Sequence, residues 1–152
     1  MINEKTCAFT GHRNLKTYGL DYPLLDRVVQ NLLKTGTTNF LCGMAIGFDI
    51  AAAESVLLYK DDYGAKLTAC LPCADQYKRF SERNKQKYFE VLERCDEVIT
   101  LAPSYFDGCM HARDRYMVEN SDILVSFLRK QSGGTFYTVN YAKKLGKKII
   151  EL

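Results

Sequence analysis

The segment Thr6-Cys7-Ala8-Phe9-Thr10-Gly11-His12-Arg13 is a short apolar run that ends in a polar turn containing glycine. Apolar runs of similar length recur along the chain, and they alternate with longer segments in which apolar residues follow the helical period. Such alternation is typical of repeated strand and helix units around a mainly parallel sheet. The sequence therefore predicts an α/β fold, a three-layer sandwich with a sheet of about six strands and helices on both faces.

The pattern places the individual strands and helices. The clearest helix carries apolar residues from Leu24 to Leu33 on one face, with Asp21 as its cap and Gly36 as its end. Strands are predicted at residues 6–10, 39–43, 66–71, 97–101, 123–127 and 148–151. Further helices are predicted at about 49–63, 83–94, 109–120 and 135–145.

Length and composition indicate a single globular domain, residues 1–152. The chain has 152 residues, of which 47% are hydrophobic and 26% charged, and this excludes disordered and collagen-like proteins. A net charge of +3 argues against a nucleic-acid partner. The local basic cluster is interpreted as a solvated helix end, with a polyanion site as the alternative. It consists of Lys143, Lys144, Lys147 and Lys148.

The beginning of the chain and its cysteines indicate the compartment. Met1-Ile2-Asn3-Glu4-Lys5 has no basic-then-apolar signal pattern, and no apolar run approaches the roughly 18 residues that span a bilayer. We therefore expect a cytoplasmic protein with no membrane partner. The six cysteines, among them Cys7 and Cys42 inside strand-like runs, are interpreted as reduced thiols.

Three turns rich in glycine and polar residues follow predicted strands. They are residues 10–13, 43–49 and 132–135. The carboxyl ends of parallel strands share one edge, where ligands bind, and free amides at a helix amino terminus bind anions, most commonly phosphate. Close approach of a ligand to the backbone is expected at Gly11, Gly43, Gly47, Gly133 and Gly134. We expect a phosphorylated ligand, with Ser132-Gly133-Gly134-Thr135 as the best single phosphate site and an ordinary helix cap as its alternative.

Two arginines are candidates for fixed cations at this edge. Arg13 follows the first strand, and Arg113 lies near the start of a predicted helix, where its planar guanidinium would bind phosphate or a ribose hydroxyl. The alternative for Arg113 is an exposed helical arginine paired with Asp114 or Glu119.

Three further side chains are candidates with two interpretations each. Asp49 either accepts hydrogen bonds from ribose hydroxyls or caps the helix that follows it. His12 either contacts the ligand or holds its turn by bonding the backbone. Glu54 lies five positions after Asp49, so helical geometry does not make the two a paired acid and base.

Several familiar sites are disfavoured by particular residues. The first turn is not Gly-x-Gly-x-x-Gly and the second strand ends in Gly43, which argues against a standard NAD dehydrogenase, and no phosphate-loop motif is present. Cys70-Leu71-Pro72-Cys73 lacks a second cysteine pair, so packing is favoured over redox or metal chemistry.

No spacing links His111 to a nucleophile. Core packing is favoured over base stacking for Tyr77, Phe80 and Tyr88.

Together, the motifs resemble the YpsA-like branch of the SLOG superfamily over nearly the whole chain. They are Thr10-Gly11-His12-Arg13, the segment 43–54, Arg113 with Asn120-Ser121-Asp122, and Ser132-Gly133-Gly134-Thr135 with Tyr141-Ala142. The resemblance implies a Rossmann-like fold and binding of a nucleotide-derived ligand such as NAD or ADP-ribose.

Two related activities follow from the wider superfamily as alternatives. The cytokinin-activating phosphoribohydrolases called LOG have a lysine where this chain has Asp114, and a glutamate that Phe136-Tyr137-Thr138 does not supply. Hydrolysis of an N-glycosidic bond would then need Asp49 or Glu54 as a substitute. The second alternative is binding of single-stranded DNA, by analogy with the DNA-processing protein DprA.

We therefore predict a domain that binds a nucleotide or nucleotide-derived small molecule at the carboxyl edge of its sheet. Whether it is an enzyme, and whether it forms a homo-oligomer, stays open. No metal and no obligatory cofactor is expected. The predicted ligand-binding residues are Thr10, Gly11, His12, Arg13, Gly43, Gly47, Asp49, Glu54, Arg113, Ser132, Gly133, Gly134 and Thr135.

Overall fold

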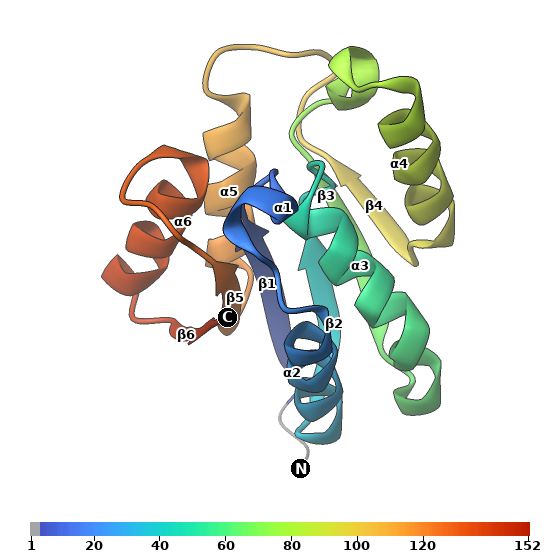
Figure 1. Ribbon diagram of the computed structural model, residues 1–152, viewed down its shortest axis with the longest axis vertical. Coiled ribbons are helices and arrows are strands. Elements are labelled where there is room, and N and C mark those ends of the chain that lie inside the picture. Colours follow the sequence, from blue (N-terminus) through green and yellow to red (C-terminus); the bar gives the residue numbers. More distant parts are fainter. Residues whose placement is uncertain (1–3) are drawn as a thin grey trace.

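Six short strands form one parallel sheet in the computed structural model, which describes residues 4–152 (Figure 1). Every neighbouring pair is parallel, in the order β4-β3-β2-β1-β5-β6. The α/β prediction is confirmed, and each predicted strand lies within two residues of an observed one. The strands are β1 (Lys5–Gly11), β2 (Thr37–Cys42), β3 (Lys66–Leu71), β4 (Glu97–Thr100), β5 (Ile123–Phe127) and β6 (Lys148–Glu151).

Helices cover both faces of the sheet and make it the middle of three layers (Figure 1). The larger core packs α2, α3 and α4 against one face, and a second core packs α5 and α6 against the other. The α-helices are α1 (Leu15–Tyr18), α2 (Tyr22–Lys34), α3 (Phe48–Tyr59), α4 (Glu82–Arg94), α5 (Cys109–Glu119) and α6 (Gly133–Lys144). Two 3₁₀ helices, η1 (Lys60–Tyr63) and η2 (Gln76–Arg79), complete the elements.

The helix with the clearest sequence pattern forms as predicted. The Asp21 side chain accepts a hydrogen bond from the Leu24 amide at 3.0 Å and caps α2. The apolar face then buries Leu25, Val29, Leu32 and Leu33. The helix predicted at 49–63 differs in its last turn, because the chain tightens into η1 after Tyr59 and ends at Gly64 in the left-handed conformation.

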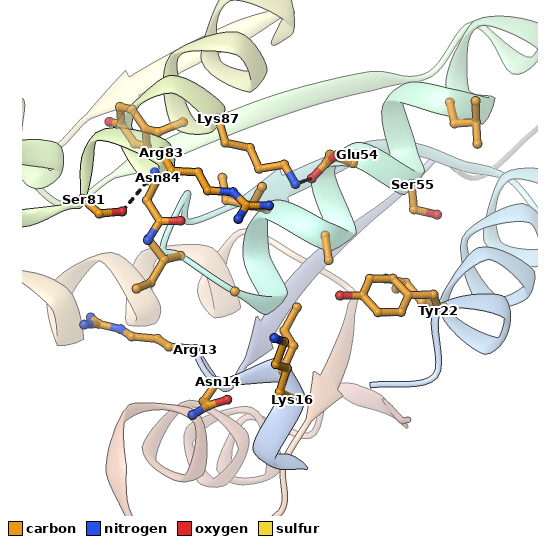
Figure 2. A pocket seen from close by; sticks show the side chains of 18 of the residues that line it. Arg13, Asn14, Lys16, Tyr22, Glu54, Ser55, Ser81, Arg83, Asn84 and Lys87 are labelled. Atoms are coloured by element: carbon orange, nitrogen blue, oxygen red, sulfur yellow. Dashed lines mark hydrogen bonds and ion pairs between the residues drawn. The ribbon is translucent and has the colours of Figure 1, made fainter. Parts of the chain in front are cut away.

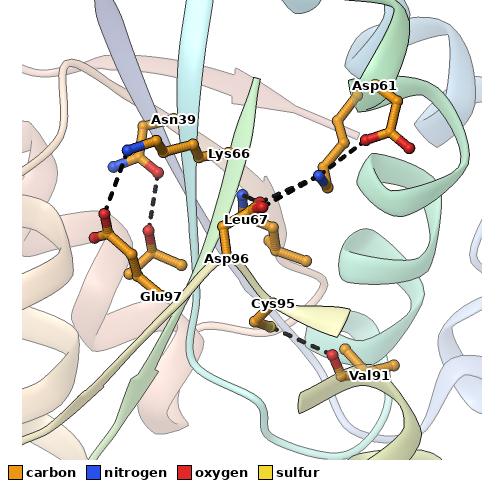
Figure 3. Close-up of polar contacts among 10 residues, drawn as sticks. Asn39, Asp61, Lys66, Leu67, Val91, Cys95, Asp96 and Glu97 are labelled. Atoms are coloured by element: carbon orange, nitrogen blue, oxygen red, sulfur yellow. Dashed lines mark hydrogen bonds and ion pairs between the residues drawn. The ribbon is translucent and has the colours of Figure 1, made fainter. Parts of the chain in front are cut away.

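One carboxylate ties the edge strand β4 to the rest of the sheet (Figure 3). Asp96, just before β4, accepts a hydrogen bond from the Leu67 amide of β3 at 2.8 Å and pairs with the buried Lys60 at 3.2 Å. On the strand itself Glu97, Val98 and Thr100 are exposed. Edge strand β4 is therefore held mainly by its one neighbour.

The strand order places the site. From β1 the chain builds β2, β3 and β4 outward on one side and then returns to add β5 and β6 on the other. In sheets of this kind, ligands bind outside the carboxyl ends of the strands at such a reversal, here between β1 and β5. Within residues 4–152 no helix has the length and apolar character needed to span a bilayer.

Candidate functional site

A pocket of about 500 Å³ opens at the reversal between β1 and β5. It is built from the turn after β1, the start of α3, the first turns of α5 and the loop that leads from β5 into α6. Ten predicted ligand-binding residues meet in its lining, which brings segments more than 100 positions apart to one place. They are Thr10, Gly11, His12, Arg13, Asp49, Arg113, Ser132, Gly133, Gly134 and Thr135.

The amino terminus of α6 faces this pocket. Ser132 occupies the N-cap position, but its side chain caps no amide among the described residues, so the first amides of the helix are available to an anion. The Lys130 ammonium lies beside this turn, since a Cβ built on Gly133 would be 3.9 Å from Lys130 Nζ. The ordinary side-chain cap that was the alternative for this segment is not formed. Lys130, which sequence reasoning missed, adds a positive charge to the helix terminus.

His12 holds the loop before α6. Its Nε2 accepts a hydrogen bond from the Arg129 amide at 2.7 Å, and its ring packs 4.4 Å from the Tyr18 ring centroid. Burial, followed by the charges of Lys130 and Arg129, lowers the pKa of His12, which favours the neutral imidazole that can accept this bond. Of the two interpretations, bonding to the backbone is the one observed.

Arg113 is buried, so the alternative of an exposed helical arginine is wrong about the exposure, whereas the pairing with Asp114 that this alternative included is observed. Its Nε donates to Asp114 at 2.8 Å, and its Nη1 donates to the carbonyl of Gly43 and to Gln76 Oε1 at 3.4 Å. A larger residue at position 43 would force this guanidinium to shift, because a Cβ there would lie 2.7 Å from Arg113 Nη1. Gly43 therefore accommodates a side chain of the protein and does not line the pocket.

Asp49 is buried at the side of the pocket near α3. Its Oδ2 accepts a hydrogen bond from the Ala45 amide at 3.2 Å, in the loop before the helix. The N-cap of α3 is Gly47, so the interpretation of Asp49 as the helix cap is wrong. Burial raises the pKa of Asp49 to about 6, although the nearby Arg113 acts in the opposite direction.

A second hollow, which we call the groove, runs between α2, α3 and α4 with a volume of about 1020 Å³ (Figure 2). Gly47 and Glu54 line the groove and lie outside the pocket. The Glu54 carboxylate forms an ion pair with Lys87 of α4 at 3.4 Å (Figure 2). Arg13 and Asn14 line both hollows, so the turn after β1 borders each of them.

Other candidates from the sequence have packing roles. Burial raises the pKa of Cys70 to about 12 and of Cys73 to about 11, which disfavours reactive thiolates at this pair. The aromatic residues after β3 pack on one another, with Tyr88 buried and its ring 5.6 Å from that of Phe80. His111 lines the pocket, and its ring stacks on Tyr137 with centroids 4.1 Å apart.

Residues 10–149 match the model of the YpsA family, which is described as the YspA SLOG family. The chain belongs to the YpsA family of SLOG proteins. Among YpsA-related sequences, UPF0398 protein BH1768 of Halalkalibacterium halodurans is 28% identical over 74% of this chain and 62% of its own length. The SPbeta prophage-derived protein YoqJ of Bacillus subtilis is 29% identical over 80% of this chain and 78% of its own length.

Two relatives extend well beyond the matched region, since the chain spans 62% and 66% of the length of the UPF0398 proteins of H. halodurans and Bacillus licheniformis. Solved structures share the fold of this YpsA-family chain at low identity. DNA processing protein A from Helicobacter pylori, described by its single-stranded DNA binding mode, superposes with a TM-score of 0.72 at 20% identity over 97% of this chain and 64% of that one. The molybdenum cofactor carrier protein of Chlamydomonas reinhardtii superposes at 0.59 with 14% identity, over 98% and 76%.

Proposed function

We propose that the pocket binds the phosphate group of a nucleotide or nucleotide-derived small molecule, with NAD and ADP-ribose as the first ligands to test. The observation that carries the proposal is the uncapped amino terminus of α6, which faces a pocket of about 500 Å³ beside Lys130. Helix amides, the helix dipole and a lysine together favour a phosphate dianion. Arg13 is exposed, lines the pocket and adds positive charge.

In this proposal the lining residues have different roles. Ser132 to Thr135 bind the phosphate, and Arg113 positions the neighbouring loop through Gly43 while contributing its charge. His12 acts indirectly, by fixing the loop that carries Lys130. Asp49 lines the pocket from the first turn of α3 and is the acceptor we assign to a ribose hydroxyl.

The test places a negative charge at the phosphate site. Gly134 has no atom of the described chain near the position of a Cβ, so a longer side chain fits there, and glutamate suits the first turn of a helix. We expect Gly134→Glu to weaken binding of AMP, ADP-ribose and NAD in calorimetry at least about tenfold, because its carboxylate competes for the same amides. Gly134→Gln, of nearly equal size, is the matched control and should lose less. Unchanged affinity in Gly134→Glu would reject the site.

Hydrolysis of an N-glycosidic bond is the second candidate, favoured by a single observation. Asp49 is buried in the pocket with its pKa raised to about 6, which is the range suited to a general acid or base near neutral pH. Glu54 lies in the groove and is paired with Lys87, so it does not assist there. Release of free base from a nucleotide panel, lost in Asp49→Asn, would establish this activity.

Nucleic acid stays among the ligand classes. The expectation against it rested on a net charge of +3, whereas the comparisons include a fold neighbour described as a single-stranded DNA binder. That neighbour is 20% identical and shows the fold alone. The local distribution of charge decides the question better than the total.

A further inference from the structure

A row of cations along α4 lines the groove and has no part in the proposed phosphate site. Its members are Arg83, Lys87 and Arg94. Residues four and eleven positions apart lie within about 40° of one another around a helix, so the three share one face. The helical rise separates consecutive members by about 6 Å and about 10 Å along the groove. The charges therefore form a line and not a clamp around one point.

Acidic side chains leave most of this row unneutralised. Within residues 4–152, Arg83 and Arg94 form no ion pair, and Lys87 reaches across to Glu54 at 3.4 Å (Figure 2). The other acidic residue of the groove, Asp26, accepts a hydrogen bond from the Ser55 hydroxyl at 2.6 Å. The glutamates of α4 lie outside the groove lining. A linear anionic ligand is the occupant that this charge distribution complements.

The remainder of the groove offers flat and apolar surface. Ile50 and Ala51 of α3 are among its lining residues. The Tyr22 side chain, with a relative exposure of 53%, lies on the α2 side of the groove (Figure 2). Exposed aromatic rings bind nucleobases by stacking, whatever the base. Cations on one wall with a ring on the opposite side therefore suit alternating phosphates and bases.

The groove and the pocket lie on either side of one turn. Arg13 and Asn14 line both, so a ligand whose phosphate lies at the amino terminus of α6 needs to pass only the turn after β1, at the exposed Arg13, to enter the groove. No acidic residue pairs with Arg13 or with the neighbouring Lys16 in the described part of the chain. The junction is therefore positively charged as well.

We propose that the ligand is longer than a mononucleotide or a pyrophosphate-linked dinucleotide such as NAD: a chain of two or more nucleotides joined by phosphodiester bonds, which begins in the pocket and runs along the cation row of α4. This inference rests on the proposed function of the pocket and names the class of ligand that fills the whole site. Phosphates spaced along a chain match cations spaced along a helix, whereas one phosphate or pyrophosphate needs only those at the pocket.

The test compares ligand length between matched variants. AMP, the dinucleotide pApA and a 5′-phosphorylated tetra-adenylate are titrated at low salt against the wild type and Arg83→Gln/Arg94→Gln. The control is Lys34→Gln/Lys85→Gln, which removes the same charge at sites outside the groove and the pocket. We expect the wild type to bind the tetranucleotide at least about tenfold more tightly than AMP, and the groove variant to lose this gain while keeping its affinity for AMP. The control should keep the gain. The salt slope for the tetranucleotide should fall by about 1.4 in the groove variant, about 0.7 for each lost contact with a single strand.

Each other outcome has a defined meaning. Equal affinity for AMP and the tetranucleotide, or unchanged tetranucleotide affinity in the groove variant, would overturn the inference and leave the pocket standing. The inference would also be overturned if polyglutamate displaced the bound tetranucleotide as effectively as unlabelled tetranucleotide does. The groove would then recognise negative charge alone. Failure of the proposed function is separate: AMP and tetranucleotide binding would both be insensitive to Gly134→Glu.

Discussion

At the scale of single residues, the glycines of the site differ in what they must accommodate. A Cβ at Gly43 would lie 2.7 Å from the buried guanidinium of Arg113, whereas one at Gly134 would meet no atom of the described chain within 4 Å. We expect Gly43→Ala to lower the free energy of unfolding by about 1–3 kcal/mol through overpacking. Gly134→Ala should change it by less than about 0.5 kcal/mol. Urea unfolding of both variants measures the difference, and equal stabilities would contradict the placement of Arg113.

Asp49 makes stability depend on pH in an unusual direction. Burial raises its pKa to about 6, whereas an unfolded aspartate titrates near about 3.9. Between these values the folded protein holds a proton that the unfolded chain has lost, so this residue lowers stability as pH rises from about 4 to about 6. The loss in free energy of unfolding is complete above pH 6 and amounts to at most about 3 kcal/mol.

The asparagine variant isolates this effect. Asp49→Asn keeps an oxygen for the Ala45 amide and removes the titration. We therefore expect the free energy of unfolding of the variant to rise relative to that of the wild type when urea unfolding is measured at increasing pH from 4.5 to 7.5. Two curves that stay parallel over this range would show that Asp49 ionises normally in the folded protein.

At the scale of elements, α2 depends on its cap. Asp21 accepts the Leu24 amide at 3.0 Å, and an amide at a helix start needs such a partner or water. Asp21→Ala should lower the free energy of unfolding by about 1 kcal/mol, and Asp21→Asn, which keeps an acceptor, by much less. Thermal or urea unfolding distinguishes the two; similar losses in both would mean that charge, and not the cap bond, stabilises this end.

The elements that could be predicted from the sequence are those with a local signal. Strands 66–71, 123–127 and 148–151 were predicted to the residue, the first two from mainly apolar runs and the last from an Ile-Ile pair between charged residues. Helix α2 combines a cap with a full apolar face. The short α1 and η2 were missed, because four residues are too few to show a helical period. The turns of the site were found through their glycines and their places after strands.

The polar side chains of the site were harder to predict, because their partners are distant in sequence. Arg113 is buried against the carbonyl of Gly43, 70 positions earlier, which no local pattern reveals. Lys130 was missed since a lysine in a loop has no periodic signal, although its place three residues after β5 would have pointed to the same edge. The cations of α4 look like an ordinary solvated face until α3 is known to lie beside them.

At the scale of the whole molecule, the sheet order predicts where the fold opens first. β1 lies in the middle of the sheet, with β2 on one side and β5 on the other, and most of its side chains are buried. β4 pairs only with β3 and exposes most of its side chains. Opening β4 leaves the central strands and both faces of their core in place, so it costs less free energy than opening β1.

Hydrogen exchange followed by mass spectrometry tests this order. We expect amides of residues 97–100 to exchange at least about tenfold faster than those of β1 and β5, which exchange only when the sheet opens globally. A bound nucleotide should slow amide exchange at the start of α6 much more than in β4. The pocket lies at the ends of β1 and β5, whereas β4 is two strands away from β1 at the edge of the sheet, with β2 and β3 between them. Equal protection of the β4 and β1 amides would contradict the position of β4 at an exposed edge of the sheet. An exposed edge has unpaired backbone groups unless another chain covers it.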